Sequence, residues 1–208
     1  ECLTAVEAVL VLAPDNSEAR ISGFYSNLHL KNFAACQTLL DDLHELGFWG
    51  ADLDRLRGEL LIAQGQFDNA LPYLKKAQAS NTKSWRLLER IGAAYLNSNE
   101  WTKAEKTFYQ ALELNPDFAM AYNGLGIALS KQKQHEEAAK AFMHSLGLLY
   151  HQPEIHLNLG LTLAAVGQSQ QAQQALNNAL AIRPEFENAR TALKQVQHSI
   201  AKAMLLQI

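Results

Sequence analysis

The sequence predicts an all-α fold, an α-solenoid of stacked helix–turn–helix repeats of 34 residues. A fixed period in this range is typical of repeat proteins, in which each unit packs only against its neighbours. Apolar residues within each unit also recur with the three- and four-residue spacing of one helical face, and no alternating strand pattern is visible. The period is marked most clearly by four glycines, Gly58, Gly92, Gly126 and Gly160.

Repeat positions alternate between small and large side chains. If each repeat begins seven residues before its glycine, position 20 is small and position 24 is bulky and apolar. Two helices approach closely only where a small side chain on one accepts a large side chain of the other, so the alternation predicts tight helix pairs. The small residues are Cys36, Ala70, Ala104, Ala138 and Ala172, and the large ones are Leu40, Leu74, Phe108, Phe142 and Leu176.

The period divides the chain into five full repeats and two end segments, expected to form one continuous solenoid domain. Residues 17–50 form a degenerate repeat, because Phe24 stands in place of the glycine. Residues 1–16 correspond to the second helix of a truncated repeat, and residues 187–208, polar at first, to a C-terminal capping helix. The regular repeats are predicted at 51–84, 85–118, 119–152 and 153–186.

Local signals mark the helix ends. Gly65 and Gly167 are expected at turns, where a left-handed residue commonly ends a helix. Pro72 is expected in the first turn of its helix, where a missing N–H is tolerated. The predicted capping residues at helix starts are Asp68, Thr102, Asp117 and Ser169.

These repeating residues resemble the tetratricopeptide repeat. The resemblance covers residues 17–186 and half a unit before them, in one register without insertions. It implies a right-handed superhelix in which the first helices of successive repeats line a concave groove for a protein or peptide partner. The residues that fit the family pattern best are Gly92, Tyr95, Ala104, Phe108, Ala111, Pro116, Gly126, Ala138, Phe142, Gly160, Gly167, Ala172, Ala179 and Pro184.

The groove that the resemblance implies changes character along the chain. Repeat positions 2, 5, 9 and 12 point into it in this family, and they lie on one helical face. The middle of the groove is charged and its C-terminal part is apolar. The predicted groove residues are Tyr25, Asp52, Arg55, Glu59, Arg86, Glu89, Arg90, Met120, Asn123, Ile127, Leu157 and Leu161.

The charged groove residues have two interpretations. They are either ordinary i,i+4 pairs on a solvated helix, as for Arg55 with Glu59, or anchors for a peptide carboxylate, which arginine binds with two parallel hydrogen bonds. Family members that bind the C-terminal carboxylates of heat-shock chaperones use a larger polar set, of which only Arg86 and Arg90 are matched. Since the other places hold Ile21, Tyr25 and Leu56, the chain is predicted not to be such a carboxylate clamp.

No catalytic, cofactor or metal motif is present in the sequence. The His-Glu-Glu sequence at 135–137 begins like a zinc-protease helix, but Ala139 stands where the second histidine is required. The Gly-Leu-Gly sequence at 124–126 lacks the third glycine of a dinucleotide motif. His156 takes a packing position and is expected in the core. We therefore predict a chain that is not an enzyme and carries no cofactor or metal.

Composition narrows the partners and leaves the compartment undetermined. The net charge of −3 gives no electrostatic reason to expect nucleic acid, and no apolar run reaches the roughly 20 residues of a membrane span. Cys2 and Cys36 hold the same position of consecutive repeats, which is too far apart for a disulfide. Both are expected to be buried free thiols, with a redox pair as the alternative.

Both ends of the chain carry expectations of their own. The sequence starts inside a repeat without a methionine, so we interpret it as a piece of a longer protein. The tail 203–208 is rich in large apolar side chains. We expect the preceding repeat, near Leu180, to cover these side chains. The alternatives are that a second copy of the chain covers them, which would make a homo-oligomer, or that further sequence does.

Three function classes follow from these observations. The leading prediction is a non-enzymatic protein–protein interaction scaffold that binds a peptide or helical segment in the concave groove. The alternatives are an accessory domain of a larger enzyme and a structural array that associates with copies of itself.

Overall fold

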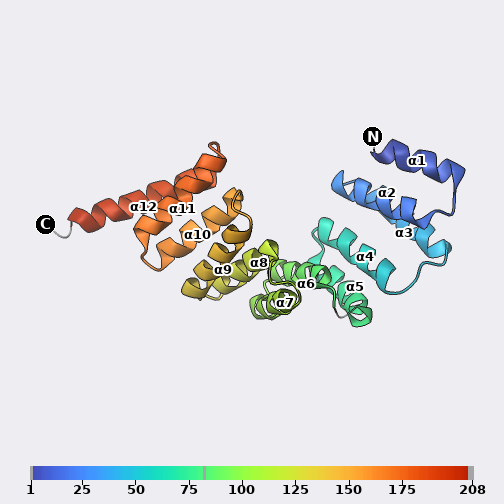
Figure 1. Ribbon diagram of the computed structural model, residues 1–208, viewed down its shortest axis with the longest axis horizontal. Helices are drawn as coiled ribbons and strands as arrows, with labels where there is room; N and C mark the ends of the chain where they lie inside the picture. Colours follow the sequence, from blue (N-terminus) through green and yellow to red (C-terminus); the bar gives the residue numbers. More distant parts are fainter. Residues whose placement is uncertain (1, 82, 206–208) are drawn as a thin grey trace. The chain divides into compact units, whose positions relative to one another are not determined.

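The computed structural model describes residues 2–81 and 83–205, without the side chains of Cys2, Leu3, Glu7 and Met204. All regular secondary structure in these residues is helical. This confirms the predicted all-α class and the C-terminal helix. The chain divides into two compact units, Glu1–Ser98 and Asn99–Ile208, and each is described by itself. Figure 1 shows helix following helix in hairpins within each unit.

The first unit is a stack in which each helix packs on the next along the chain. Asn16, Asn32 and Ser84 cap helices here, because each side-chain oxygen accepts a hydrogen bond from a backbone N–H three residues on. The helices are α1 (Cys2–Leu12), α2 (Ser17–His29), α3 (Phe33–Glu45), α4 (Ala51–Ala63), α5 (Phe67–Ser80) and α6 (Trp85–Asn97).

The second unit repeats this arrangement and ends in a longer helix. That last helix packs on the two before it through Ala189, Ala192 and Val196, which are buried. The helices are α7 (Trp101–Leu114), α8 (Ala119–Lys131), α9 (His135–Leu148), α10 (Pro153–Ala165), α11 (Ser169–Ile182) and α12 (Glu187–Leu205).

A left-handed residue stands at position 15 of every repeat. It includes the predicted turn glycines Gly65 and Gly167, and glycine tolerates this conformation best because it has no Cβ. The φ angles are 58° at Lys31, 76° at Gly65, 60° at Asn99, 64° at Lys133 and 81° at Gly167.

The helices that follow these turns start earlier than the capping signals predicted. Helix α5 begins at Phe67, so Pro72 lies in its second turn and the prediction of a first-turn proline is wrong. Asp68 and Thr102 are the second residues of their helices, after Gln66 and Glu100 in the cap position. The reason is the turn itself, because the left-handed residue leaves only one residue before helical backbone resumes.

In three of the regular repeats, at Gly58, Gly126 and Gly160, the glycine lies at a close approach of the two helices of that repeat. A Cβ placed on Gly58 would lie 2.5 Å from a methyl carbon of Leu74, and one on Gly126 would lie 2.7 Å from the ring of Phe142. Both distances are shorter than carbon atoms tolerate, so only glycine fits. The predicted pairing of small with large residues is therefore seen in the packing of these helix pairs.

The degenerate repeat solves the same packing problem differently. Phe24 is fully buried in a cluster with Leu40 and Leu43, and the thiol of Cys36 donates to the Phe24 carbonyl oxygen at 3.5 Å. Cys36 is thus a buried free thiol as predicted, and burial raises its pKa. The side chain of Cys2 lies outside the described residues.

The apolar tail is described only up to its beginning. Leu205 is 74 % exposed, so the last described residue of α12 has no cover from the preceding repeat. Residues 206–208, on which most of the tail prediction rests, lie outside the described residues. A homo-oligomer formed through this tail stays a prediction.

The packing at Gly126 predicts the outcome of a single methyl addition. Gly126→Ala is expected to lower the free energy of unfolding by about 1–3 kcal/mol, because the new Cβ collides with Phe142. Gly147→Ala is the matched control, since a Cβ on this helical glycine meets no atom within 4 Å. That change should be neutral or stabilising by up to about 1 kcal/mol. Chemical denaturation of both variants gives the comparison, and equal stabilities would refute the packing argument.

Candidate functional site

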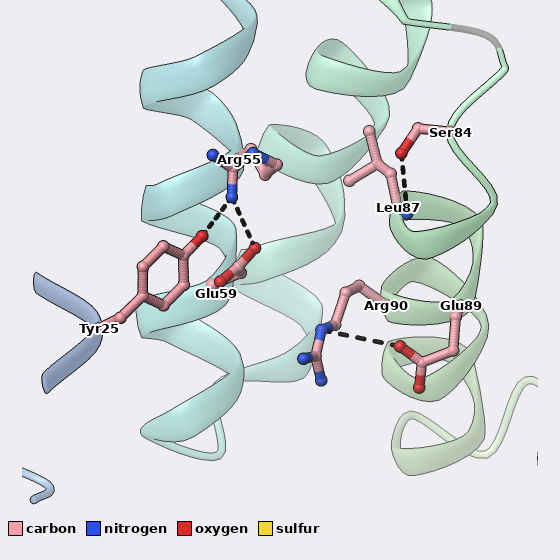
Figure 2. Close-up of polar contacts among 7 residues, drawn as sticks. All are labelled: Tyr25, Arg55, Glu59, Ser84, Leu87, Glu89 and Arg90. Carbon is pink, nitrogen blue, oxygen red and sulfur yellow. Dashed lines mark hydrogen bonds and ion pairs between the residues drawn. The ribbon is translucent and has the colours of Figure 1, made fainter. Parts of the chain in front are cut away.

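The charged part of the predicted groove contains a hydrogen-bonded cluster in the first unit. Arg55 on α4 donates from Nη1 to the Glu59 carboxylate, one turn later, at 3.0 Å, and to the Tyr25 hydroxyl on α2. Figure 2 shows Arg55 between these two side chains. The pair with Glu59 is the i,i+4 pairing that the sequence suggested. The guanidinium is therefore already engaged and holds α2 and α4 together.

Helix α6 supplies the other charged groups of this face. The Arg90 Nε lies 3.7 Å from the Glu89 carboxylate, and half of the Arg90 side chain is exposed. Burial raises the pKa of Glu89, the negative charge of Glu59 raises it further, and Arg90 opposes both. Arg86 is exposed, and its guanidinium lies 4.3 Å from the ring centroid of Trp85.

Five of the predicted residues in the first unit are thus electrostatically coupled, across three helices. The pKa of Tyr25 is raised by burial first and by the charge of Glu59 second, and Glu59 also acts on Glu89. Asp52 and Arg86 are exposed in the first turns of α4 and α6. Arg86 and Arg90 are therefore the arginines of this face whose exposed guanidinium groups a ligand could contact.

The apolar part of the predicted groove lies on α8 and α10 of the second unit. Met120 and Leu161 are 43 % and 47 % exposed, whereas Asn123 and Ile127 are half-buried. Leu157 is only 9 % exposed, because α10 packs on α8 as well as on α9. The outward-facing apolar surface is therefore smaller than the sequence predicted, and Leu157 belongs to the core.

A hollow on another side of α4 was not predicted from the sequence. It has a volume of about 370 Å³ and lies between α3, α4 and α5. Leu40, Leu60 and Leu61 contribute apolar lining, and Arg57 and Gln64 contribute polar lining. The available signal was Arg57, a charged residue at a position where later repeats have an aliphatic side chain.

His156 is a core residue, as predicted. Its Nε2 donates to the Tyr150 carbonyl oxygen at 3.0 Å, which leaves Nδ1 as the unprotonated nitrogen. This Nδ1 is buried without a hydrogen-bond partner in the described part of the chain. Burial lowers the pKa of His156, and the nearby His151 lowers it further. The imidazole is therefore a neutral packing group.

The remaining chemistry of the described residues is sparse. Residues 2–81 and 83–205 contain no group of three or more histidine, cysteine, aspartate or glutamate side chains that could hold a metal ion. Within the same residues, no helix has both the length and the hydropathy needed to cross a membrane.

Comparison with known families matches the chain to one repeat type. Models of the tetratricopeptide repeat match residues 61–108, 89–143 and 153–186, which together exceed half of the chain. The chain belongs to the tetratricopeptide repeat family. This confirms the resemblance that the glycine, alanine and aromatic positions indicated.

Relatives of this tetratricopeptide repeat chain are distant and longer. It is 24 % identical over 173 residues to human cilia- and flagella-associated protein 70, covering 82 % of the chain and 15 % of that protein. It is 32 % identical over 104 residues to the peroxisomal targeting signal receptor of Candida albicans, covering 50 % of the chain and 17 % of the receptor. The chain thus spans less than a fifth of each of these relatives.

Solved structures share the tetratricopeptide repeat fold with this chain. A chain of the APC/C hetero-tetramer Cut9–Hcn1 matches with a TM-score of 0.85 and 20 % identity. The match covers 93 % of this chain and 38 % of the chain in that structure. YrrB, described as a TPR protein with an unusual peptide-binding site, matches 91 % of the chain and 98 % of its own with a TM-score of 0.69 and 18 % identity. At these identities the likeness concerns the fold.

Burial of His156 predicts a pH dependence of stability. The folded pKa lies below the unfolded value near 6.5, so the unfolded chain binds the extra proton first as the pH falls. The contribution of His156 to the free energy of unfolding is therefore fully present above pH 6.5. It decreases as the pH falls below that value and levels off below the folded pKa. The loss amounts to about 1.4 kcal/mol for each unit between the two pKa values.

A pair of histidine variants isolates this contribution. Denaturation of His156→Gln at several pH values should show a flatter profile in this window, since the buried imidazole at this position is removed. His144→Gln removes an exposed imidazole from α9 and should keep the wild-type slope. An unchanged slope in His156→Gln would contradict the assignment of a neutral buried imidazole.

Proposed function

We propose that this tetratricopeptide repeat chain is a non-enzymatic protein-interaction scaffold that binds a peptide or helical segment with the concave faces of its first helices. The fold supports this, because helical solenoids present extended concave surfaces to partners. In the first unit the proposed binding surface is the polar cluster of α2, α4 and α6. In the second unit it is the apolar surface of Met120, Ile127 and Leu161 on α8 and α10. Nucleic acid is not expected, given the mildly acidic charge.

The observation that carries the proposal is the contrast between three arginines. Arg55 is paired with Glu59 and hydrogen-bonded to the Tyr25 hydroxyl. Arg86 and Arg90 are exposed on the same predicted face, although the Arg90 Nε also lies 3.7 Å from the Glu89 carboxylate. Guanidinium groups in this setting suit the carboxylates of a peptide. We therefore propose that the partner segment of the first unit carries acidic residues that bind Arg86 and Arg90. The fold neighbours include a protein described as peptide-binding, and one relative is described as a receptor, which agrees with this class of function.

The proposal differs from binding of chaperone tails. The polar set needed for that role is matched only by Arg86 and Arg90, so the exclusion of a chaperone-tail clamp stays part of the proposal. The accessory-domain and self-association alternatives stay predictions without a structural observation in their favour.

Charge reversal of the two arginines tests the groove. Peptides are first selected on the wild-type chain from a phage-displayed random library, and their affinities are then measured by fluorescence anisotropy. The double variant Arg86→Glu/Arg90→Glu should bind them about tenfold or more weakly, since each carboxylate contact becomes a repulsion. Its helical content should be unchanged, because both side chains are exposed.

The matched control reverses two exposed lysines elsewhere. Lys106→Glu/Lys194→Glu makes the same change in net charge on α7 and α12. Equal affinities of the two double variants would show a non-specific charge effect and would refute the groove. Selection of no peptide by the wild-type chain would do the same.

A further inference from the structure

The hollow between α3, α4 and α5 contains a cation in a place that the repeat reserves for an aliphatic side chain. Arg57 holds position 7 of its repeat, directly before Gly58. The same position is filled by Ile91, Leu125 and Leu159, and all three are buried. A long charged side chain cannot pack as they do, so an open volume of about 370 Å³ remains beside it.

Arg57 also has no partner of opposite charge. In the described part of the chain, its guanidinium makes no ion pair and no hydrogen bond, although it is only partly exposed. Other polar side chains in the same helix pair do have partners, because Asp54 pairs with Lys76 at 3.4 Å. A partly exposed guanidinium that has no acceptor within the described chain is available to an anionic ligand.

The hollow is separate from the proposed groove. Arg57 and Glu59 are two residues apart on α4, which places their side chains about 200° apart around the helix axis. Glu59 lies on the side of α4 that carries Arg55 and Tyr25, so Arg57 points to the other side. A ligand in the hollow would therefore leave the groove residues free.

The lining defines the chemistry of a ligand. One guanidinium without a second cation fits the single charge of a carboxylate better than the double charge of a phosphate. Leu40 and Leu60 are buried beneath the hollow, so the accessible apolar contact comes from Leu61 and the ring of Tyr73. The Gln64 amide offers hydrogen bonds beside them. The Gln37 side-chain amide, also in the lining, already donates to the Asp41 carboxylate at 2.9 Å.

The size of the hollow limits the ligand to about one residue. A volume near the lower end of the range for ligand sites holds one apolar side chain with its carboxylate, and a continuous peptide segment needs more. A carboxylate and an apolar side chain occur on the same carbon only at the end of a chain. We infer that this hollow binds the C-terminal residue of a partner protein, with the terminal carboxylate on Arg57 and an apolar side chain against Leu61 and the ring of Tyr73.

Two small probes that differ only in charge test the inference. N-acetylleucine carries the terminal carboxylate and the apolar side chain, and N-acetylleucinamide lacks the charge. In an NMR titration of the whole chain, N-acetylleucine should shift the Gln64 side-chain amide and the Leu61 methyl signals. N-acetylleucinamide should shift them with an affinity about tenfold weaker or less.

Substitution of Arg57 links the shifts to the guanidinium. Arg57→Leu restores the residue type of this position, so it should fold with a melting temperature at or above that of the wild type. It should bind N-acetylleucine about tenfold or more weakly. Arg57→Gln is a second variant that keeps a polar side chain without charge, and it should lose binding to the same extent. Arg86→Glu/Arg90→Glu should bind the probe as the wild type does, which separates this site from the groove.

Further probes distinguish the sources of an anion. N-acetylglutamate α-amide carries a side-chain carboxylate, and inorganic phosphate carries charge without an apolar part. The inference requires that N-acetylleucine bind more tightly than either. It is overturned if N-acetylleucine causes no shift, if phosphate or the glutamate derivative binds equally well, or if both Arg57 variants bind N-acetylleucine as the wild type does.

Discussion

The structure depends on the close contact between the two helices of a repeat at its glycine, seen in three of the regular repeats. At Gly58, Gly126 and Gly160 a single methyl group would collide with the large residue of the facing helix. This contact fixes the rotation of the first helix about its own axis. The positions around the glycine then face the neighbouring helices, and the positions on the other side become the candidate binding surface. The assignment of groove residues is therefore a consequence of core packing.

The first full repeat shows that the constraint can be met in another way. Gly23 precedes the usual position by one residue, and a Cβ on it would lie 3.0 Å from Val6 on α1. Phe24 stands at the position that glycine holds in the regular repeats and is fully buried. Asn27 replaces the usual large residue and is buried, with its amide donating to the Gly23 carbonyl oxygen at 2.9 Å. The repeat keeps its helix pair because each irregular residue is compensated locally.

The sequence predicted what is periodic, and it missed what depends on one distance in space. The repeat length, the buried Cys36 and His156, and the turn residues Gly65 and Gly167 followed from position in the period. Helix starts were misplaced, as at Pro72, because a capping residue such as Asp68 signals a helix start only to within a residue or two. Burial of Leu157 and the hollow beside Arg57 depend on how closely neighbouring helices approach. The pattern of residues within one helix does not reveal the distance to its neighbours.

The electrostatics of the first unit rank the two exposed arginines of the proposed groove. A peptide carboxylate that binds Arg90 must compete with Glu89, and it would leave Glu89 half-buried without its counter-charge. That cost is considerable, because burial and Glu59 already raise the pKa of Glu89. Arg86 rests on the ring of Trp85, which orders the guanidinium and leaves its N–H groups for a ligand. Arg86 is therefore the stronger anchor in the proposed binding mode, and Arg90 contributes mainly by holding Glu89 in its charged form.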